Sequence, residues 1–423
     1  MTSTTDLSQS HDAGHAVPAG FDPTDPDINV VAIPHEQFRA MRATEPIRWV
    51  EQGPEAAAGF LGPAAEGYWA VTKHADIAAI SKDSKHFSTS VNGAIIRFAP
   101  EMTRDQVEMQ SVMMINQDDP SHGNLRRIIS RGFTPRAVNG LKDALAAAAH
   151  QIAEDARAKG TGCFVEDIAS ELPLQAIADL LGVPQEDRRK LFHWSNQMLS
   201  YDDPEIEGDA EGASVEILNY FMPIAEDRKA NPGDDIVSKL VNAGEDGEGL
   251  TSDEFGFFVI LLTVAGNETS RNSITHGMKA FFDHPDQWEL FKAERPETAV
   301  DEIIRWATPV TVFQRTAIED VEIGGVQVRK GQRVGIFYGS GNFDEEVFDD
   351  PFTFDITRDP NPHLAFGGHG AHYCIGANLA RLTVGLMFNA IADTIPDIRL
   401  VSDPRRLRHS WINGIKEMRV AYV

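Results

Sequence analysis

Hydrophobic and polar residues alternate along most of the chain at the spacing of amphipathic helices. Beyond the first hundred residues, apolar positions recur every three or four residues, which predicts helices with one buried face. The clearest such segments are 139–159, 166–181, 184–199 and a last helix that begins near Ile375. Helices therefore make up most of the predicted structure.

One predicted helix is much longer than the others. It runs from about Ser252 to His284, and Thr251 with Glu254 forms a capping box at its start. Pro285 ends it. Residues 255–265 are apolar on nearly every side of this helix, which predicts that it passes through the middle of the protein.

Strand patterns are few and short. Ile47–Glu51 and Tyr68–Thr72 read as strands, and 321–338 is a β-rich segment with a two-residue turn at Gly324 and Gly325. Short, local strands among many helices predict a fold that is mainly α with a small β region.

Composition narrows the classes of protein further. The 423 residues carry a formal net charge of −26, which argues against a nucleic-acid partner because such proteins need a basic face. The longest apolar run is shorter than the ~18 residues of a membrane span, so no integral membrane segment is expected. Two cysteines and no secretion signal predict a soluble, cytoplasmic protein. We expect a flexible polar tail over 1–20 and a single domain over 21–423.

One of the two cysteines has an unusual setting. Cys374 lies in the stretch FGGHGAHYCIG, ahead of a predicted helix whose N-terminus favours a thiolate. A buried structural cysteine is the usual alternative, and Cys163 fits it. No second cysteine or paired histidine accompanies Cys374, so zinc fits poorly, while a cysteine nucleophile needs a histidine base. Ligation of haem iron by a single thiolate is the better match.

This stretch resembles the haem-binding loop of the cytochrome P-450 family. Gly370, His372, Cys374 and Gly376 match the family pattern, whereas Phe366 lies one residue upstream of the aromatic position. The resemblance implies the cytochrome P-450 fold, with a long helix over the haem, and haem b held by the Cys374 thiolate. The displaced Phe366 implies a loop one residue longer.

Two further motifs agree with the resemblance. Glu302 and Arg305 match the family's ExxR pair, which is structural there; an exposed ion pair on a helix is the alternative. Residues 265–269, AGNET, match the acid-threonine element of the long helix. The resemblance implies that Gly266 leaves room for dioxygen and that Glu268 and Thr269 supply protons. A hydrogen bond to the carbonyl four residues earlier is the alternative for Thr269.

The haem propionates require basic partners. His122 and Arg126 are spaced for one face of a helix. By resemblance, Arg315 and His372 are the other two partners, and His363 is a weaker candidate.

Longer stretches resemble one branch of the family, the bacterial steroid C26-monooxygenases. That branch oxidises the terminal methyl group of the cholesterol or cholest-4-en-3-one side chain, and it implies a narrow apolar tunnel. Hydroxylation of methyl-branched lipids and non-enzymatic haem or sterol binding are the alternatives. The residues that we expect to line the tunnel, with core packing as the alternative for each, are Ile95, Ile96, Phe98, Met198, Val264, Ala265, Val310, Phe313 and Trp411.

The resemblance also implies an external source of electrons. We expect a ferredoxin and its reductase, docked on a local basic patch that Arg126, Arg127 and Arg131 could supply. A peroxygenase driven by hydrogen peroxide would not need Glu268 and Thr269, so their presence counts against it.

Overall fold

The computed structural model describes residues 17–206, 208–233, 235–242 and 249–423. Most of the predicted polar tail, residues 1–16, lies outside the described residues. Within the described parts, no helix combines the length and apolar character that crossing a membrane requires.

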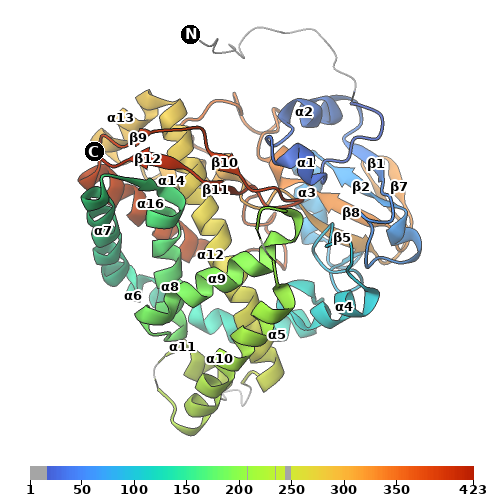
Figure 1. Cartoon of the computed structure of the whole chain (residues 1–423). Coiled ribbons are helices and arrows are strands. Elements are labelled where there is room, and N and C mark those ends of the chain that lie inside the picture. The colour runs from blue at the N-terminus through green and yellow to red at the C-terminus, as the bar shows by residue number, and fades with distance from the viewer. Residues whose placement is uncertain (1–16, 207, 234, 243–248) are drawn as a thin grey trace.

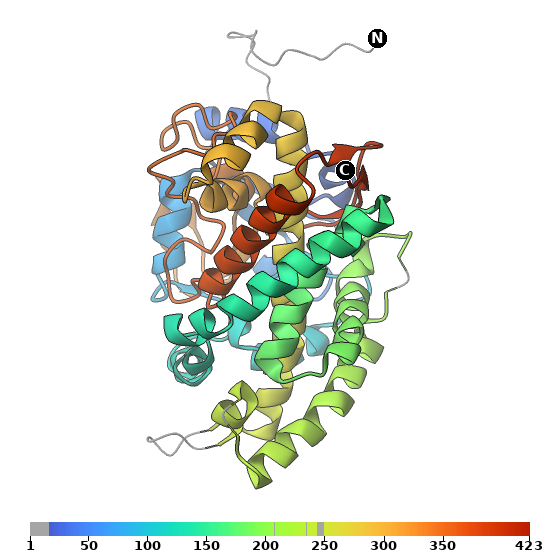
Figure 2. The same ribbon diagram turned by 90° about the vertical axis from the view of Figure 1, so that its left-hand side faces the viewer.

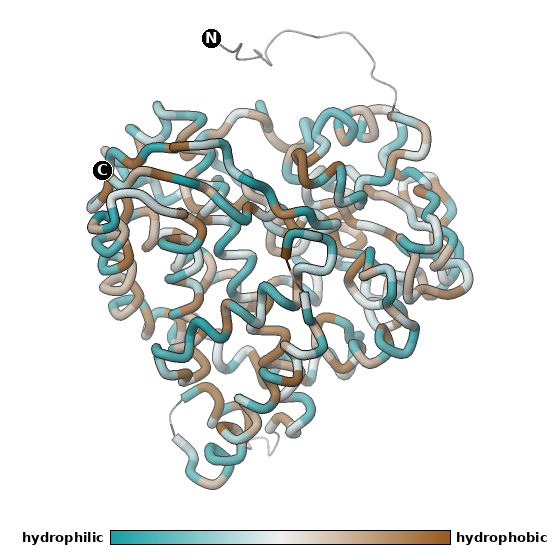
Figure 3. The backbone as a smooth tube through the Cα atoms, in the orientation of Figure 1, coloured by the Kyte–Doolittle hydropathy of each residue, from teal (hydrophilic) through white to brown (hydrophobic). Residues whose placement is uncertain are grey.

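Helices dominate the chain, as predicted. They are α1 Pro26–Asn29, α2 His35–Thr44, α3 His74–Lys82, α4 Arg104–Met109, α5 Ser121–Ile129, α6 Pro135–Gly140, α7 Lys142–Lys159, α8 Glu171–Leu181, α9 Arg188–Leu199, α10 Ala210–Ala230, α11 Ile236–Val241, α12 Ser252–Asp283, α13 Pro285–Glu294, α14 Ala299–Ala307, α15 Tyr338–Gly341 and α16 Ala377–Thr394. Along most of them the hydropathy alternates within a turn or two, as amphipathic helices require (Figure 3).

The strands are short and form small sheets. They are β1 Ile47–Glu51, β2 Gly67–Val71, β3 Phe87–Ser88, β4 Thr161–Cys163, β5 Phe313–Ala317, β6 Val321–Ile323, β7 Val326–Val328, β8 Arg333–Ile336, β9 Arg399–Leu400, β10 Arg405–Arg406, β11 Ile415–Glu417 and β12 Arg419–Ala421. The largest sheet has the order β1-β2-β8-β5-β3, in which only the β2–β8 pair is parallel.

Several predicted boundaries agree closely with the structure. The capping box of Thr251 and Glu254 is formed at the start of α12, and His284 caps its end. Gly324 and Gly325 both have positive φ in the turn between β6 and β7, the conformation for which glycine is suited.

Two predicted helices are interrupted. The segment 139–159 divides between α6 and α7 at Leu141. The segment 166–181 begins with a turn of π-helix, Val165–Ala169, before α8. Spacing of apolar residues cannot show either break, because the residues on both sides of it keep their buried face.

The arrangement places α12 between a helical side and the sheet. In Figure 1 the large sheet lies on one side of α12, while α7, α8, α14 and α16 lie on the other. Helices α8, α9, α10, α14 and α16 all pack against α12. The long helix is therefore central, as its sequence predicts, and the loop that carries Cys374 leads directly into α16.

Candidate active site

A cavity of about 230 Å³ lies between α12 and the loop that carries Cys374. Its walls are mainly apolar and come from α8, α12, the segment 309–315 and the segment 365–376. Cys374 and Thr269 both line it, although they are more than a hundred residues apart in sequence. The fold thus brings the two principal motifs of the sequence to one cavity.

The cysteine loop is held by its own backbone. The Cys374 amide donates to the Phe366 carbonyl over 2.8 Å, so the aromatic residue lies beside the cysteine although it is out of the family register. The extra length is absorbed by three successive residues with positive φ, Gly367, Gly368 and His369. The Phe366 ring lines the cavity.

Gly370 has a packing reason to be glycine. A Cβ atom there would lie 1.6 Å from the Ser81 carbonyl oxygen, so any side chain would collide with the backbone of α3. The loop therefore packs directly against α3, and this contact fixes the position of the loop relative to the cavity.

Burial raises the pKa of the Cys374 thiol, whereas the Gly376 amide and the charges of Arg126 and Arg381 act to lower it. Burial is the largest of these effects. The Gly376 amide and the two positive charges act in the direction that favours a thiolate, and desolvation opposes them. A bound metal ion would supply the missing stabilisation of the anion.

One face of α12 forms the opposite wall. Ala265, Gly266 and Thr269 line the cavity there. The Thr269 hydroxyl donates to the Ala265 carbonyl over 2.8 Å, which is the hydrogen bond expected of a threonine within a helix. A Cβ at Gly266 would lie 2.4 Å from Cδ1 of Ile177, so the glycine also lets α8 approach α12.

Glu268 points away from the cavity. Its carboxylate forms a buried ion pair with Arg271 and accepts from Asn272 Nδ2 over 2.8 Å. It is 1% exposed and does not line the cavity. Of the two residues, only Thr269 lines the cavity, because the Glu268 carboxylate is engaged by Arg271 and Asn272.

Four basic side chains converge on one edge of the cavity. They are His122, Arg126, Arg315 and His372, and all four line it. The His122 and His372 rings are 4.2 Å apart. Burial is the main cause that lowers the pKa of each of the four side chains, to about 2 for His372. A group of buried bases with lowered pKa values favours an anionic ligand.

The hydrogen bonds of these bases leave capacity for such a ligand. Arg126 donates to the Tyr373 carbonyl over 2.5 Å and Arg315 to its neighbour's carbonyl over 2.7 Å. His122 Nε2 is buried and has no hydrogen-bond partner among the described residues. The set therefore fits the two carboxylates of a haem, next to a cysteine that can ligate its iron.

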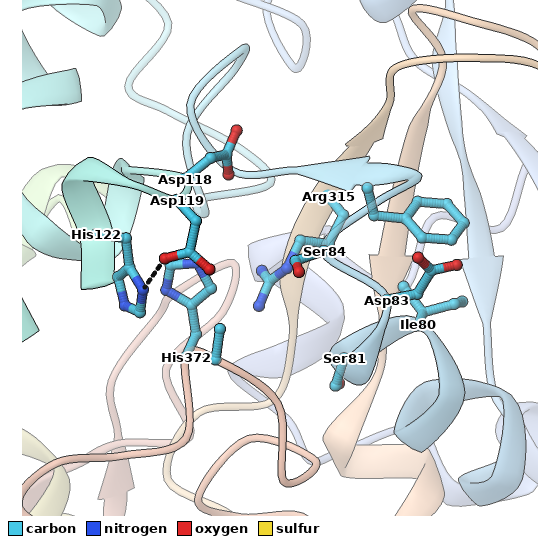
Figure 4. Close-up of a pocket in the computed structure, with 11 residues that line it drawn as sticks. Ile80, Ser81, Asp83, Ser84, Asp118, Asp119, His122, Arg315 and His372 are labelled. Carbon is cyan, nitrogen blue, oxygen red and sulfur yellow. Dashed lines mark ion pairs between the residues drawn. The ribbon is translucent and has the colours of Figure 1, made fainter. Parts of the chain in front are cut away.

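A second, small cavity lies outside this basic edge. It measures about 10 Å³, the space of one water molecule, and Asp118, Asp119, His122, Arg315 and His372 are among its walls (Figure 4). The Asp118 carboxylate accepts from the Thr89 amide over 2.8 Å, and the Thr89 hydroxyl contacts His372 Nε2 at 3.1 Å. Thr89 thus orients His372, a role that no spacing in the sequence indicated.

His363 does not belong to the basic edge. Its Nε2 lies 3.0 Å from Asp301 Oδ1, and Arg381 donates to the same oxygen over 2.8 Å. It does not line the cavity. The weaker propionate assignment for His363 is therefore wrong in this structure, because Asp301 already satisfies the ring.

The Glu302–Arg305 pair is not an exposed ion pair. Both side chains are fully buried, and Arg305 donates through Nε and Nη2 to the two Glu302 oxygens over 2.7 and 2.8 Å. Arg305 Nη1 also donates to the carbonyls of Asn342 and Pro351. The pair joins α14 to the chain that leads toward the cysteine loop, as a structural role requires.

The predicted tunnel residues divide into two groups. Ala265, Val310 and Phe313 line the cavity. The other six do not line it. Met198 packs against the helical core, and Phe98 packs against Phe60. The remaining four belong to an apolar cluster that also contains the cavity residues Val310 and Phe313; they are Ile95, Ile96, Val264 and Trp411. Substrate contact by these six residues stays a prediction.

Part of the cavity lining was not predicted from the sequence. Phe258, Leu261 and Leu262 of α12 line the cavity, as do Met114 and Ala94 from the segment before α5. The three α12 residues share a helix face with Thr269, so the helical repeat counted back from Thr269 was a usable signal. Nothing comparable marked Ala94, which lies in a loop, or Met114, which begins a single turn of 3-10 helix.

An apolar cavity between a cysteine and a threonine-bearing helix, with a basic edge for two carboxylates, defines a haem-thiolate enzyme. The sequence model of the family described as Cytochrome P450 matches residues 297–392. A steroid C26-monooxygenase of Rhodococcus jostii is 58% identical over 96% of this chain and 85% of its own length. The chain therefore belongs to the cytochrome P450 family.

Other relatives and solved structures agree. A Mycolicibacterium smegmatis steroid C26-monooxygenase is 56% identical over 96% of this chain and 94% of its own. A Mycobacterium tuberculosis methyl-branched lipid omega-hydroxylase is 41% identical over 86% of each chain. The structure of a Mycobacterium marinum cytochrome P450 with pseudoionone matches with a TM-score of 0.86 at 34% identity, over 93% of this chain and 97% of that one.

These findings confirm four predictions: the family, the mainly helical P450 fold, a monooxygenase, and haem b with a cysteine ligand as the cofactor. They also support an electron-transfer protein as redox partner. The individual site residues and the single-domain organisation stay predictions.

Proposed function

We propose that this enzyme hydroxylates the terminal methyl group, C26 or C27, of the cholesterol or cholest-4-en-3-one side chain, using dioxygen and two electrons. The observation that carries the proposal is the 56–58% identity to steroid C26-monooxygenases over 96% of the chain. The mainly apolar cavity beside Cys374 and Thr269 supports it, because a sterol side chain offers no polar group to such a site.

The chain's own residues have separate tasks. Cys374 would ligate the haem iron, and His122, Arg126, Arg315 and His372 would bind the haem carboxylates. When bound, the haem would supply the activation of dioxygen, which a thiolate ligand to its iron favours. Thr269 presents a hydroxyl inside the cavity, where it can donate a proton toward the reacting oxygen.

Glu268, which lies outside the cavity, would supply that proton to Thr269. Its carboxylate is buried one residue before Thr269 and is held by Arg271. To act, the Glu268 carboxylate has to leave that ion pair, take up a proton from water and turn toward the Thr269 hydroxyl, so that the acid moves first and the proton reaches the cavity afterwards.

Substrate orientation would come from burial. Apolar surface gains about 25 cal/mol per Å² when it leaves water, so a sterol can bind tightly with few polar contacts. The walls that Val310, Phe313 and Leu262 form determine which carbon lies nearest the iron.

The electron donor that we propose is a ferredoxin with its reductase. Such iron–sulfur donors are commonly acidic, so docking needs a basic area on this acidic chain. Residues 121–142 supply five Arg or Lys side chains and no Asp or Glu. The cytoplasmic location stays a prediction.

Omega-hydroxylation of methyl-branched lipids is a second candidate, favoured by the 41% identity to such an enzyme. Titration of the ferric enzyme separates the two. We expect cholest-4-en-3-one to shift the iron to high spin at lower concentration than a methyl-branched fatty acid does. The reverse order would favour the lipid hydroxylase. A sterol that binds but never stimulates oxygen consumption with ferredoxin and reductase would indicate a non-enzymatic binding protein.

A further inference from the structure

The sulfur-bearing side chains are unevenly placed around the cavity. The chain has 11 methionines, and one segment holds Met102, Met109, Met113 and Met114. Within the described part of the chain, Met114 is the only methionine that lines the cavity. Cys374 is the other sulfur-bearing residue in the lining, and it is the proposed ligand of the haem iron. Met114 therefore carries the cavity sulfur that is not committed to the metal.

Buried hydrogen bonds fix the turn that carries Met114. It begins a single turn of 3-10 helix, Met114–Asn116. The Asn116 side chain, which is 4% exposed, accepts from the Ala94 amide over 2.9 Å and donates to the Gln110 carbonyl over 3.0 Å. Ala94 also lines the cavity. Because Asn116 ties the turn to a residue of the cavity wall, the Met114 thioether is held at that wall.

Helices cover the cavity on the side of the molecule away from the large sheet. Helices α8 and α16 contribute Ile177 and Leu379 to its walls, and α7 packs against both of these helices. In Figure 2 the red α16 and the teal α7 cross in front of α12. An oxidant that forms in the cavity therefore meets the lining before it reaches bulk water. Met109, in the same methionine-rich segment, is 65% exposed on the surface.

We propose that Met114 is an oxidation site, at which hydrogen peroxide formed in the cavity converts the thioether to methionine sulfoxide and thereby weakens the binding of an apolar substrate. Dioxygen takes up two electrons and two protons and leaves as hydrogen peroxide in every turnover that fails to hydroxylate the substrate. The sulfur gives an electron pair to one peroxide oxygen and the O–O bond breaks. The second oxygen leaves as water with both protons, so thioether and peroxide yield sulfoxide and water.

This oxidation makes an apolar wall polar. The sulfoxide oxygen accepts hydrogen bonds from water while the cavity is free of substrate, but the mainly apolar walls offer it little replacement once a lipid displaces that water. Burying an acceptor without a donor costs free energy, and that cost opposes binding. The oxidised enzyme should therefore bind cholest-4-en-3-one several-fold more weakly. The oxidation itself requires only that dioxygen is reduced in the cavity, whichever lipid is the substrate.

The identity of the methionine that is oxidised first tests where the peroxide acts. The haem-loaded enzyme is turned over with ferredoxin, its reductase, dioxygen and cholest-4-en-3-one, and excess catalase removes peroxide from the bulk solution. Peptide mass spectrometry then gives the sulfoxide content of each methionine. Met114 should be oxidised several-fold faster than the exposed Met109. Peroxide added from outside, without turnover, should oxidise Met109 first. A parallel reaction without catalase measures the peroxide that turnover releases.

Leucine variants test the effect on binding, because leucine keeps the size and apolar character of methionine and resists oxidation. The ferric enzyme is titrated with cholest-4-en-3-one before and after turnover, and the intact haem is counted from the reduced carbon monoxide adduct. Wild type and the matched control Met109→Leu should lose affinity several-fold, whereas Met114→Leu should keep the affinity that it had before turnover. The proposal would be overturned by oxidation of Met109 ahead of Met114 under catalase, by turnover without peroxide, or by an equal loss of affinity in Met114→Leu.

Discussion

The two cysteines of the chain differ only in their surroundings. Cys163 ends β4 and packs in the helical core, where a thiol acts as a small apolar group. Cys374 lines the cavity, with the Gly376 amide and the charge of Arg126 acting on its sulfur. The same side chain thus packs as a structural group in one place and is the proposed metal ligand in the other.

Replacing each cysteine tests this difference. Cys374→His should abolish the red-shifted Soret band of the reduced carbon monoxide adduct, because that band requires a thiolate ligand. Cys163→Ser is the matched control and should keep it. Spectra of the two purified variants decide the matter, and a red-shifted band in the histidine variant would refute the assignment of Cys374.

Thr263, on a different face of α12, makes the same kind of hydrogen bond as Thr269. Both hydroxyls donate to the carbonyl four residues earlier, over 2.8 and 2.7 Å, but only Thr269 lines the cavity. Thr269→Ala should divert most of the consumed oxygen to hydrogen peroxide, since the proton donor in the cavity is lost. Thr263→Ala should leave the ratio of product to oxygen unchanged. Equal coupling in the two variants, measured with an oxygen electrode and a peroxide assay, would remove the role of Thr269.

At the scale of elements, the sequence predicts α12 well and its contacts poorly. The capping box and Pro285 determine where the helix begins and ends, and both are local signals. The pairing of Glu268 with Arg271 also has a local signal, which is the i,i+3 spacing. Whether the Glu268 side chain faces Arg271 or the cavity depends on the rotation of α12 about its axis relative to α8 and α9. Such a rotation is set by packing between distant segments and cannot be deduced from one helix.

The contact between α12 and α8 can be measured through Gly266. Alanine there would gain about 1 kcal/mol of helix propensity, but its Cβ would overlap Cδ1 of Ile177. Overpacking of this kind costs about 1–3 kcal/mol, so Gly266→Ala should lower the free energy of unfolding by at most about 2 kcal/mol. In an Ile177→Val background, which removes Cδ1, the same change should become neutral or stabilising. Equal effects in both backgrounds, measured by denaturant unfolding, would exclude the predicted contact.

The buried Glu302–Arg305 pair should dominate the stability of the region around α14. Glu302→Gln leaves Arg305 uncompensated at a fully buried position, and we expect a loss of about 3–5 kcal/mol in the free energy of unfolding. Asp393→Asn breaks a partly exposed pair with Arg295 and should cost about 1 kcal/mol or less. Similar losses in both variants would contradict the structural role of the buried pair.

At the scale of the whole molecule, the site is built from segments that are distant in sequence. His122 has the helical spacing to Arg126 and His372 lies in the glycine-rich stretch, but only the resemblance to a family grouped them with Arg315 before the structure did. Thr89 and Asp301, which orient His372 and His363, had no signal at all, because their partners lie far along the chain. Spacing predicts helices and faces, whereas the cavity results from how those faces meet.

The account depends most on which carbon the cavity presents to the haem. The direct measurement is the product formed from cholest-4-en-3-one by the enzyme with ferredoxin, its reductase and dioxygen, identified by mass spectrometry and NMR. We predict one oxygen atom on the terminal methyl group of the side chain, with the rings unchanged. Oxygen on the sterol rings, or no sterol product while a methyl-branched lipid is hydroxylated, would contradict the account.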